Sequence, residues 1–150
     1  MDMDKLNLNQ SFIEISQDLM VALDREGNVV YINPKGCEIL QEKESKILGC
    51  NWFDHFFDKN LNEEVKSVYL DLVNGNKEFS EYFENTIVTS RGENVMLSWH
   101  NKAIYDEKGK IIYVLSAGKD ISVREDCKSK LKQATLALEL VVDKLKPSTT

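Results

Sequence analysis

The hydrophobic pattern near the N-terminal end predicts two strands joined by a tight turn. The apolar run Leu19–Leu23 is followed by the polar segment Asp24–Asn28, in which Gly27 can adopt the positive φ that turns often need. A second, largely apolar run, Val29–Asn33, follows directly, and this order is typical of a β-hairpin. Because proline cannot donate a backbone hydrogen bond, Pro34 ends the second strand.

The segment that precedes these strands has a weaker pattern. Residues 1–10 are mostly polar, so we expect a flexible N-terminus there. Phe12, Ile15 and Leu19 then fall at positions i, i+3 and i+7, which predicts a short helix with one apolar face.

Between the first two strands and the later ones the pattern is helical. Gly36–Leu40 predicts one or two helical turns, and residues 41–60 predict irregular structure with short helices. A longer amphipathic helix is expected to begin at Asn62 and to end at Asn74–Asn76, where Gly and Asn favour a helix end.

The second half of the chain carries three strand patterns in hairpin succession. The strands are expected over Phe79–Val88, around Val95–His100 and over Ile111–Ile121, with turn residues at 90–93 and 106–109. The sequence therefore predicts an α+β fold, with a mostly antiparallel sheet of five strands and a helical insert between strands 2 and 3. The alternation leaves open which face of the sheet points inward.

After the last strand the pattern changes to that of a helix. Ser122–Glu125 forms a capping box, with Ser at the cap and Glu three residues later. We expect a C-terminal helix over residues 123–146, which Pro147 ends, and a short tail over 147–150.

Apolar residues recur along this helix at alternating spacings of four and three, the pattern of a coiled-coil seam. The seam residues are Cys127, Leu131, Ala134, Leu138, Val141 and Leu145. A helix this short is marginally stable alone, so we expect it to pair in a homodimer. A helix folded back on its own sheet stays open as an alternative, because Leu136, Leu140 and Val142 widen the apolar face.

Length and composition indicate one domain with short extensions. The chain has 150 residues, of which 42% are hydrophobic and 29% charged, which is enough for a core and excludes a wholly disordered chain. A net charge of −6 argues against nucleic acid as a partner. No apolar run has the length of a membrane span, so we expect no membrane insertion. The three cysteines lack CxxC spacing, which favours reduced thiols and a cytoplasmic location.

Catalytic and metal-binding patterns are missing from the sequence. It contains no GxSxG, HExxH, P-loop or dinucleotide-binding motif. The histidines, His55 and His100, have no partners at a recognised spacing, and Asp54, His55 and Asp58 favour a solvated turn over a metal site. We therefore expect that the chain has no catalytic residues, binds no metal and is not itself an enzyme.

Four stretches carry a family resemblance. They read, in order, VALDREGNVVYINPKG, LGCNWFDHFF, LSWHNKAIYDEKGKII and GKDIS. Together they resemble the PAS sensory domain of two-component histidine kinases, and GKDIS is similar to the Asp-Ile-Thr signature that ends this domain. We place the domain at residues 11–122. The resemblance implies a five-stranded antiparallel sheet with helices on one face, often around a small cavity, and a role in sensing a ligand, redox state or partner.

The same resemblance implies that the junction after the last strand passes a signal onward. The transmission residues would be Asp120, Ile121, Ser122 and Glu125. The C-terminal helix has no phospho-acceptor histidine, so the effector, in the first instance a histidine kinase, is expected C-terminal to this chain or in trans.

The sequence requires no cofactor. Flavin photosensors of this superfamily carry a cysteine at the fourth position of a Gly-x-Asn-Cys run, where this chain has Trp52 and a cysteine displaced to Cys50. A flavin adduct is therefore not expected, whereas a non-covalent flavin stays open. Haem-binding members usually take a histidine from the helix before the third strand, and the helix predicted from Asn62 has none.

A ligand cavity, if present, would be lined mainly by aromatic side chains. The candidates are Asn33, Cys37, Trp52, Phe53, Phe56, Trp99 and Ser116. The alternative is that these residues fill the core, which would make the chain a ligand-free dimerisation or docking module. A redox sensor that binds haem or flavin is a third reading.

Overall fold

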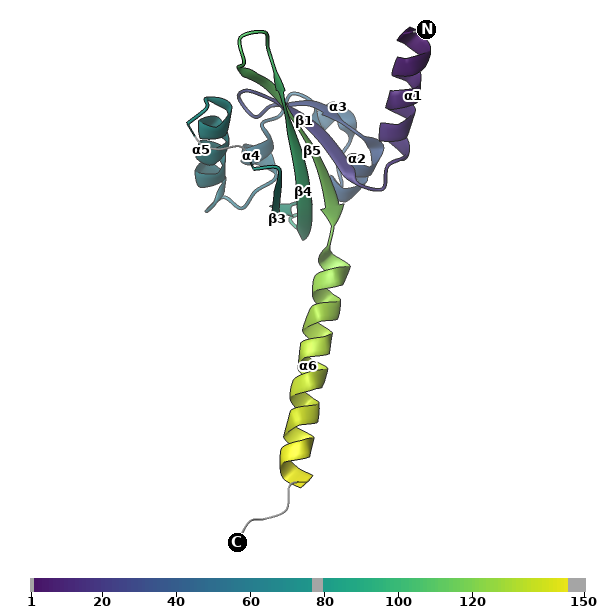
Figure 1. The fold of residues 1–150 in the computed structure, drawn as a ribbon, viewed down its shortest axis with the longest axis vertical. Helices are drawn as coiled ribbons and strands as arrows, with labels where there is room; N and C mark the ends of the chain where they lie inside the picture. Colours follow the sequence, from purple (N-terminus) through teal and green to yellow (C-terminus); the bar gives the residue numbers. More distant parts are fainter. Residues whose placement is uncertain (1, 77–79, 146–150) are drawn as a thin grey trace. The chain divides into compact units, whose positions relative to one another are not determined.

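Five strands form one antiparallel sheet in the computed structural model of the chain (Figure 1). They are β1 (Leu19–Asp24), β2 (Val29–Ile32), β3 (Tyr82–Val88), β4 (Asn94–Tyr105) and β5 (Ile111–Asp120). Their order is β2-β1-β5-β4-β3, so the first hairpin pairs with the last strand. The structure describes the backbone of residues 2–76 and 80–145, and the side chains of residues 8–76, 80–122, 128–142 and 144.

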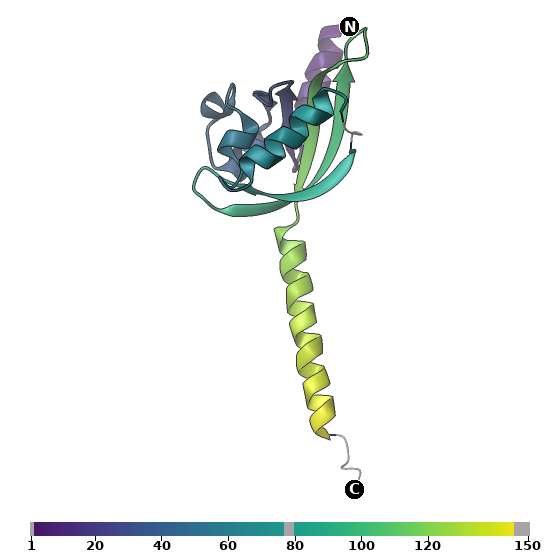
Figure 2. The same ribbon diagram turned by 90° about the vertical axis from the view of Figure 1, so that its left-hand side faces the viewer.

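Helices α2 (Pro34–Leu40), α3 (Glu44–Ile47), α4 (Trp52–His55) and α5 (Asn62–Val73) lie between β2 and β3 in the sequence. Helix α1 (Asp2–Ile15) precedes β1, and α6 (Ser122–Leu145) follows β5. Helices α2 to α5 gather on one face of the sheet (Figure 2). The predicted α+β fold with its helical insert is confirmed. The chain divides into two units, residues 1–120 and 121–150.

The strand register decides which side chains face the helices, a question that the sequence left open. Val21 of β1 and Asn101 of β4 both lie opposite Ser116 of β5, and Trp99 lies opposite Gly118. Partners in register share a face of the sheet, so these residues belong to the inner face. Trp99 and Val21 are buried, whereas Leu115, one position from Ser116, is exposed on the other face.

The N-terminal segment differs from the prediction of a flexible stretch over residues 1–10 followed by a short helix. Its backbone is helical from Asp2 to Ile15, and Leu19 begins β1, where it is fully buried. Leu8, Phe12 and Ile15 are all exposed. Because residues 1–10 are mostly polar and the apolar residues Leu8, Phe12 and Ile15 stay exposed, the hydrophobic pattern indicated only the part of this helix around Phe12 and Ile15.

Asn33 joins α1, β1 and α2 through its buried side chain. Its Oδ1 accepts from the backbone N–H of Met20 at 2.9 Å and from that of Gly36 at 2.9 Å, which caps α2. Its Nδ2 donates to the carbonyl of Ile13 at 3.1 Å and to that of Asp18 at 2.9 Å. One fully buried amide therefore satisfies four backbone groups, which belong to α1, β1, α2 and the segment between α1 and β1.

Tyr69 connects α5 to the end of β1. Its hydroxyl donates to the carbonyl of Asp24 at 2.7 Å, and its ring lies 4.9 Å from that of Phe53. Burial, with a smaller contribution from the negative charges of Asp24 and Glu26, raises the pKa of Tyr69 above its ordinary range.

Replacing Asn33 with alanine is expected to lower the free energy of unfolding by about 2–4 kcal/mol, because buried backbone groups lose their partners. Urea denaturation measures this change. The control is Asn60→Ala, at an exposed asparagine, which we expect to change stability by less than about 0.5 kcal/mol. Equal losses in the two variants would contradict the role given to Asn33.

The raised pKa of Tyr69 predicts a stability loss at high pH. Above the ordinary tyrosine pKa of about 10, the unfolded chain releases this proton while the folded chain retains it, so rising pH favours unfolding. We expect Tyr69→Phe to weaken this pH dependence, whereas Tyr105→Phe, at an exposed tyrosine, should leave it unchanged. Thermal unfolding followed from neutral to alkaline pH tests this, and parallel curves for wild type and Tyr69→Phe would refute it.

Candidate ligand-binding site

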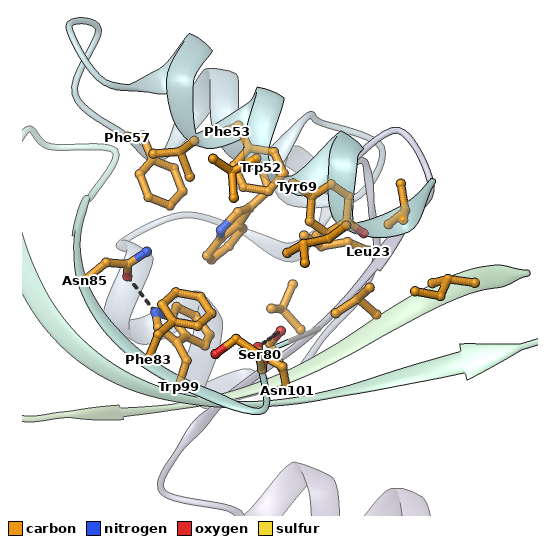
Figure 3. Close-up of a pocket in the computed structure, with 18 of the residues that line it drawn as sticks. Leu23, Trp52, Phe53, Phe57, Tyr69, Ser80, Phe83, Asn85, Trp99 and Asn101 are labelled. Atoms are coloured by element: carbon orange, nitrogen blue, oxygen red, sulfur yellow. Dashed lines mark hydrogen bonds between the residues drawn. The ribbon is translucent and has the colours of Figure 1, made fainter. Parts of the chain in front are cut away.

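A pocket of about 380 Å³ lies between the sheet and helices α4 and α5 (Figure 3). Its walls are mainly apolar. The sheet contributes Val21, Leu23, Phe83, Asn85, Trp99, Asn101, Ile111, Val114 and Ser116, and Ser80 lies just before β3. The helical side contributes Trp52, Phe53, Phe57, Glu64, Val65, Val68, Tyr69, Leu72 and Val73. The aromatic residues therefore do not fill the interior completely, which is the point that the sequence left undecided.

Aromatic contacts hold two walls of the pocket against each other. The indole of Trp52 on α4 meets that of Trp99 on β4 edge to face, with ring centroids 5.9 Å apart. The ring of Phe53 stacks on that of Phe57, with ring centroids 5.6 Å apart. Such pairs have preferred geometries, so they restrict the movement of α4 relative to the sheet.

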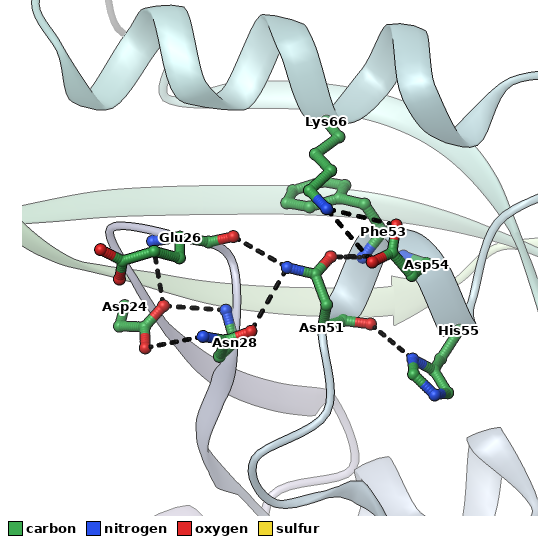
Figure 4. A network of polar contacts seen from close by, with 8 residues as sticks. All are labelled: Asp24, Glu26, Asn28, Asn51, Phe53, Asp54, His55 and Lys66. Carbon is green, nitrogen blue, oxygen red and sulfur yellow. Dashed lines mark hydrogen bonds and ion pairs between the residues drawn. The ribbon is translucent and has the colours of Figure 1, made fainter.

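A polar network fixes α4 to the β1–β2 turn (Figure 4). Asn51 caps α4 by accepting from the N–H groups of Phe53 at 3.1 Å and Asp54 at 3.3 Å. Its Nδ2 donates to the carbonyl of Glu26 in the turn at 2.8 Å. Asp24 closes the turn by accepting from the backbone N–H of Asn28 at 2.8 Å. The aromatic residues of α4 are thus positioned by hydrogen bonds from a segment distant in sequence.

The turn also accommodates the ring of Phe53 directly. Gly27 has a φ of +87°, and a Cβ there would lie 2.8 Å from the ring of Phe53. Both the backbone conformation and the contact require glycine. The glycine recognised in the sequence as a turn residue therefore also makes room for a pocket residue.

Trp99 is held on its other side by Gly118. A Cβ on Gly118 would lie 2.8 Å from the nearest ring atom of Trp99, so the indole packs directly on the backbone of β5. Its Nε1 donates to Oδ1 of Asn85 at 2.7 Å. Contacts from two neighbouring strands therefore determine the position of this side chain.

The sheet side of the pocket carries the polar side chains of Ser116, Asn101 and Asn85. Ser116 Oγ donates to Oδ1 of Asn101 at 2.6 Å, and Nδ2 of Asn101 donates to the carbonyl of Ser80 at 3.4 Å. Asn85 is a further polar side chain of the pocket, and its position is fixed by the hydrogen bond from Trp99. An apolar pocket with a few fixed polar groups is the usual form of a small-molecule site.

The pocket opens between α5 and β3. Val68 on α5 is 38% exposed and Phe83 on β3 is 41% exposed, although both line the pocket. Glu64, one helical turn before Val68, is exposed at the same rim. Deeper lining residues such as Trp52 and Val73 are buried.

Four of the seven residues proposed from the sequence as cavity-lining do line the pocket: Trp52, Phe53, Trp99 and Ser116. The other three do not. Asn33 is engaged in hydrogen bonds with the backbone, and Cys37 lies on α2. Phe56 is buried beside Trp52, with ring centroids 5.1 Å apart.

Other lining residues were missed by the sequence analysis. The apolar stripe of α5, which includes Val65 and Leu72, repeats with a helical period in the sequence and could have indicated that this helix faces the pocket. Asn85 and Asn101 offered none, because polar residues within strands are ordinarily read as facing solvent.

The predicted transmission residues lie at the junction between β5 and α6. Asp120 ends β5, Ile121 follows, and Ser122 is the first residue of α6. Asp120 and Ser122 each take part in interactions within the structure. The side chain of Glu125 lies outside the described residues, so the capping box stays a prediction.

The predicted seam residues all fall within α6. In a helix, spacings of three and four place Leu131, Ala134, Leu138 and Val141 on one face. The side chains of Cys127 and Leu145 lie outside the described part of the chain.

The described cysteines are free thiols. Cys50 Sγ donates to the carbonyl of Lys46 at 2.9 Å. Burial raises the pKa of Cys37, which keeps its thiol protonated at neutral pH. Within the described part of the chain, no cluster of side chains could hold a metal ion, and no helix is long and apolar enough to cross a membrane.

Comparison with solved structures identifies similar folds. A PAS domain of an HTR-like protein from Haloarcula marismortui is 22% identical, with a TM-score of 0.62 over 79% of this chain and 93% of that one. The PAS domain of the RpfR quorum-sensing receptor of Cronobacter turicensis is 23% identical, with a TM-score of 0.58 over 71% and 96%. A domain of a sensory box sensor histidine kinase/response regulator from Geobacter sulfurreducens is 18% identical, with a TM-score of 0.61 over 80% and 97%.

These identities show a shared fold only. No curated protein matches the chain. The family model described as PAS fold matches residues 7–121, which is most of the chain and includes all the strands and the complete pocket. The chain thus belongs to the PAS family of sensory domains.

Proposed function

We propose that this PAS domain is the input domain of a signalling protein and that its pocket binds a small, largely apolar molecule. The pocket itself carries the proposal. A volume of about 380 Å³, walled by aliphatic and aromatic side chains, is sufficient for a small ligand. Burial of apolar ligand surface would supply the main driving force for binding.

A structural neighbour supports an apolar ligand. The PAS domain of Cronobacter turicensis RpfR has been solved in complex with BDSF and in complex with C12:0. Because that domain is only 23% identical to this chain, the comparison assigns no ligand here. The two complexes show that a PAS domain of similar fold accommodates BDSF and C12:0.

The proposal includes transmission from the pocket to α6. Ser116 lines the pocket, and the same strand ends at Asp120, after which Ile121 and Ser122 lead into α6. A ligand that binds one arrangement of the sheet more tightly than another would shift the balance between them. We propose Asp120, Ile121 and Ser122, with Glu125, as the residues that pass this shift to α6.

The partners of α6 complete the proposal. We propose that its seam residues pair with those of a second copy in a parallel coiled coil, and that the effector, in the first instance a histidine kinase, acts beyond this helix or in trans. The free thiols of Cys37 and Cys50 fit a cytoplasmic setting.

Ligand binding is tested by filling the pocket. The dye Nile red is expected to bind the wild-type chain and to change the emission of its two tryptophans, both of which line the pocket. Ser116→Leu, which adds a larger side chain inside the pocket, should weaken binding by about tenfold or more. The matched control is Ala117→Leu, which adds the same side chain on the opposite face of β5. Failure of the wild type to bind, or equal binding by both variants, would contradict the proposal.

Dimerisation through α6 is tested by placing a charge in the seam. The wild-type chain should sediment as a dimer, and Leu138→Lys should shift it to monomer, because a lysine in an apolar seam loses its hydration. Gln133→Lys adds the same charge to α6 outside the seam and should leave the dimer intact. A wild-type monomer throughout the concentration range would exclude the coiled-coil pairing.

A further inference from the structure

The orientation of the Asn85 side chain is determined by its neighbour. The indole nitrogen of Trp99 can only donate a hydrogen bond, so the atom of Asn85 that it meets at 2.7 Å must be the oxygen. The amide nitrogen of Asn85, with two N–H groups, is therefore directed away from Trp99. Figure 3 shows this nitrogen facing the space between the sheet and α4. Asn85 thus presents donors to the pocket and uses its acceptor elsewhere.

Trp52 supplies a second donor. Only 4% of its surface is exposed, and its indole N–H bonds to no described residue. Every fully buried polar side-chain atom in the described part of the chain has a partner. The N–H of Trp52 is therefore accessible, and the pocket that its ring lines provides that access.

The polar groups of Asn101 and Ser116 already form hydrogen bonds within the protein. Asn101 accepts from Ser116 at 2.6 Å and donates to the carbonyl of Ser80 at 3.4 Å. Asn85, with two N–H groups, and Trp52, with one, are therefore the main hydrogen-bond donors left for a ligand.

Charge restricts the ligand further. Among the described lining residues none is a lysine, arginine or histidine, and Glu64 at the rim is the one carboxylate. A carboxylate ligand would lose its hydration without gaining a cationic partner, at a cost that exceeds the gain from two neutral donors. An ammonium group at the inner end of the pocket would meet the N–H groups of Asn85 and Trp52, which cannot accept its hydrogen bonds, because the carboxylate of Glu64 lies at the exposed rim.

We infer that the pocket is selective for an uncharged ligand that has an apolar body and a polar end that accepts hydrogen bonds, such as a carboxamide, an ester or a ketone. Asn85 and Trp52 are the residues that recognise this end. The inference rests on the proposed function, because it assigns the ligand class of the same pocket.

The first test compares three ligands that share a chain and differ in the head group. Decanamide, decanoate and decylamine are each titrated at neutral pH against the wild-type chain loaded with Nile red. Decanamide should displace the dye at a concentration about tenfold or more below that of either charged ligand, since burying an unpaired charge is costly.

The second test changes the donors of Asn85. Asn85→Asp keeps an oxygen for the indole of Trp99 and replaces the amide donors with a second oxygen, so the pocket retains its shape. We expect the affinity for decanamide to fall by about tenfold, and Trp52→Phe to cause a smaller loss in the same direction. Asn94→Asp, at an exposed asparagine of β4, introduces the same charge outside the pocket and should have no effect.

The outcomes separate the two proposals. If Nile red binds and Ser116→Leu abolishes binding, the ligand pocket stands, whatever the head group. Equal or tighter binding of decanoate or decylamine would then overturn the selectivity for an uncharged ligand. Unchanged decanamide affinity in Asn85→Asp would overturn the role of Asn85. If Nile red does not bind the wild-type chain, the proposed function itself is wrong.

Discussion

The contact between Trp99 and Gly118 is the constraint on which the pocket depends. Because β5 carries no side chain at Gly118, the indole packs on the backbone, where a Cβ would approach it to 2.8 Å. In this position Trp99 meets Trp52 edge to face and donates to Asn85. One missing side chain thus allows a single ring to form a wall of the pocket, to contact α4 and to orient a polar group on the neighbouring strand.

The opposite wall depends on hydrogen bonds that are distant in sequence. Asn51 caps α4 and also donates to the β1–β2 turn, while Tyr69 donates to the carbonyl of Asp24 at the start of the same turn. The turn is therefore the common support of α4 and α5. Tyr69 is buried and Asn51 is half-buried, and their hydrogen bonds hold both helices to this turn beside the pocket.

Under the proposed function, binding would be connected to output by a short path along one strand. Ser116 reaches the pocket, and Asp120, which ends the same strand, precedes α6 by one residue. A sheet is stiff along its strands because each backbone group is paired with a neighbour. In the proposed mechanism, a ligand that alters the twist or spacing of β5 would act on this junction through the strand itself.

The sequence by itself determined the order of strands and helices and the family, because turns, caps and hydrophobic periods are local features. Gly27, Pro34 and the capping pattern at Ser122 each indicated the boundary of an element. It indicated a helix around Phe12 and Ile15 but not its extent back to Asp2, and it assigned Asn33 to a cavity although its amide bonds to backbone groups. Only the tertiary structure decided which strand face is inner, that the aromatic residues leave a space, and that Asn85 and Asn101 face it. These features depend on register and on contacts between distant segments, which no local pattern records.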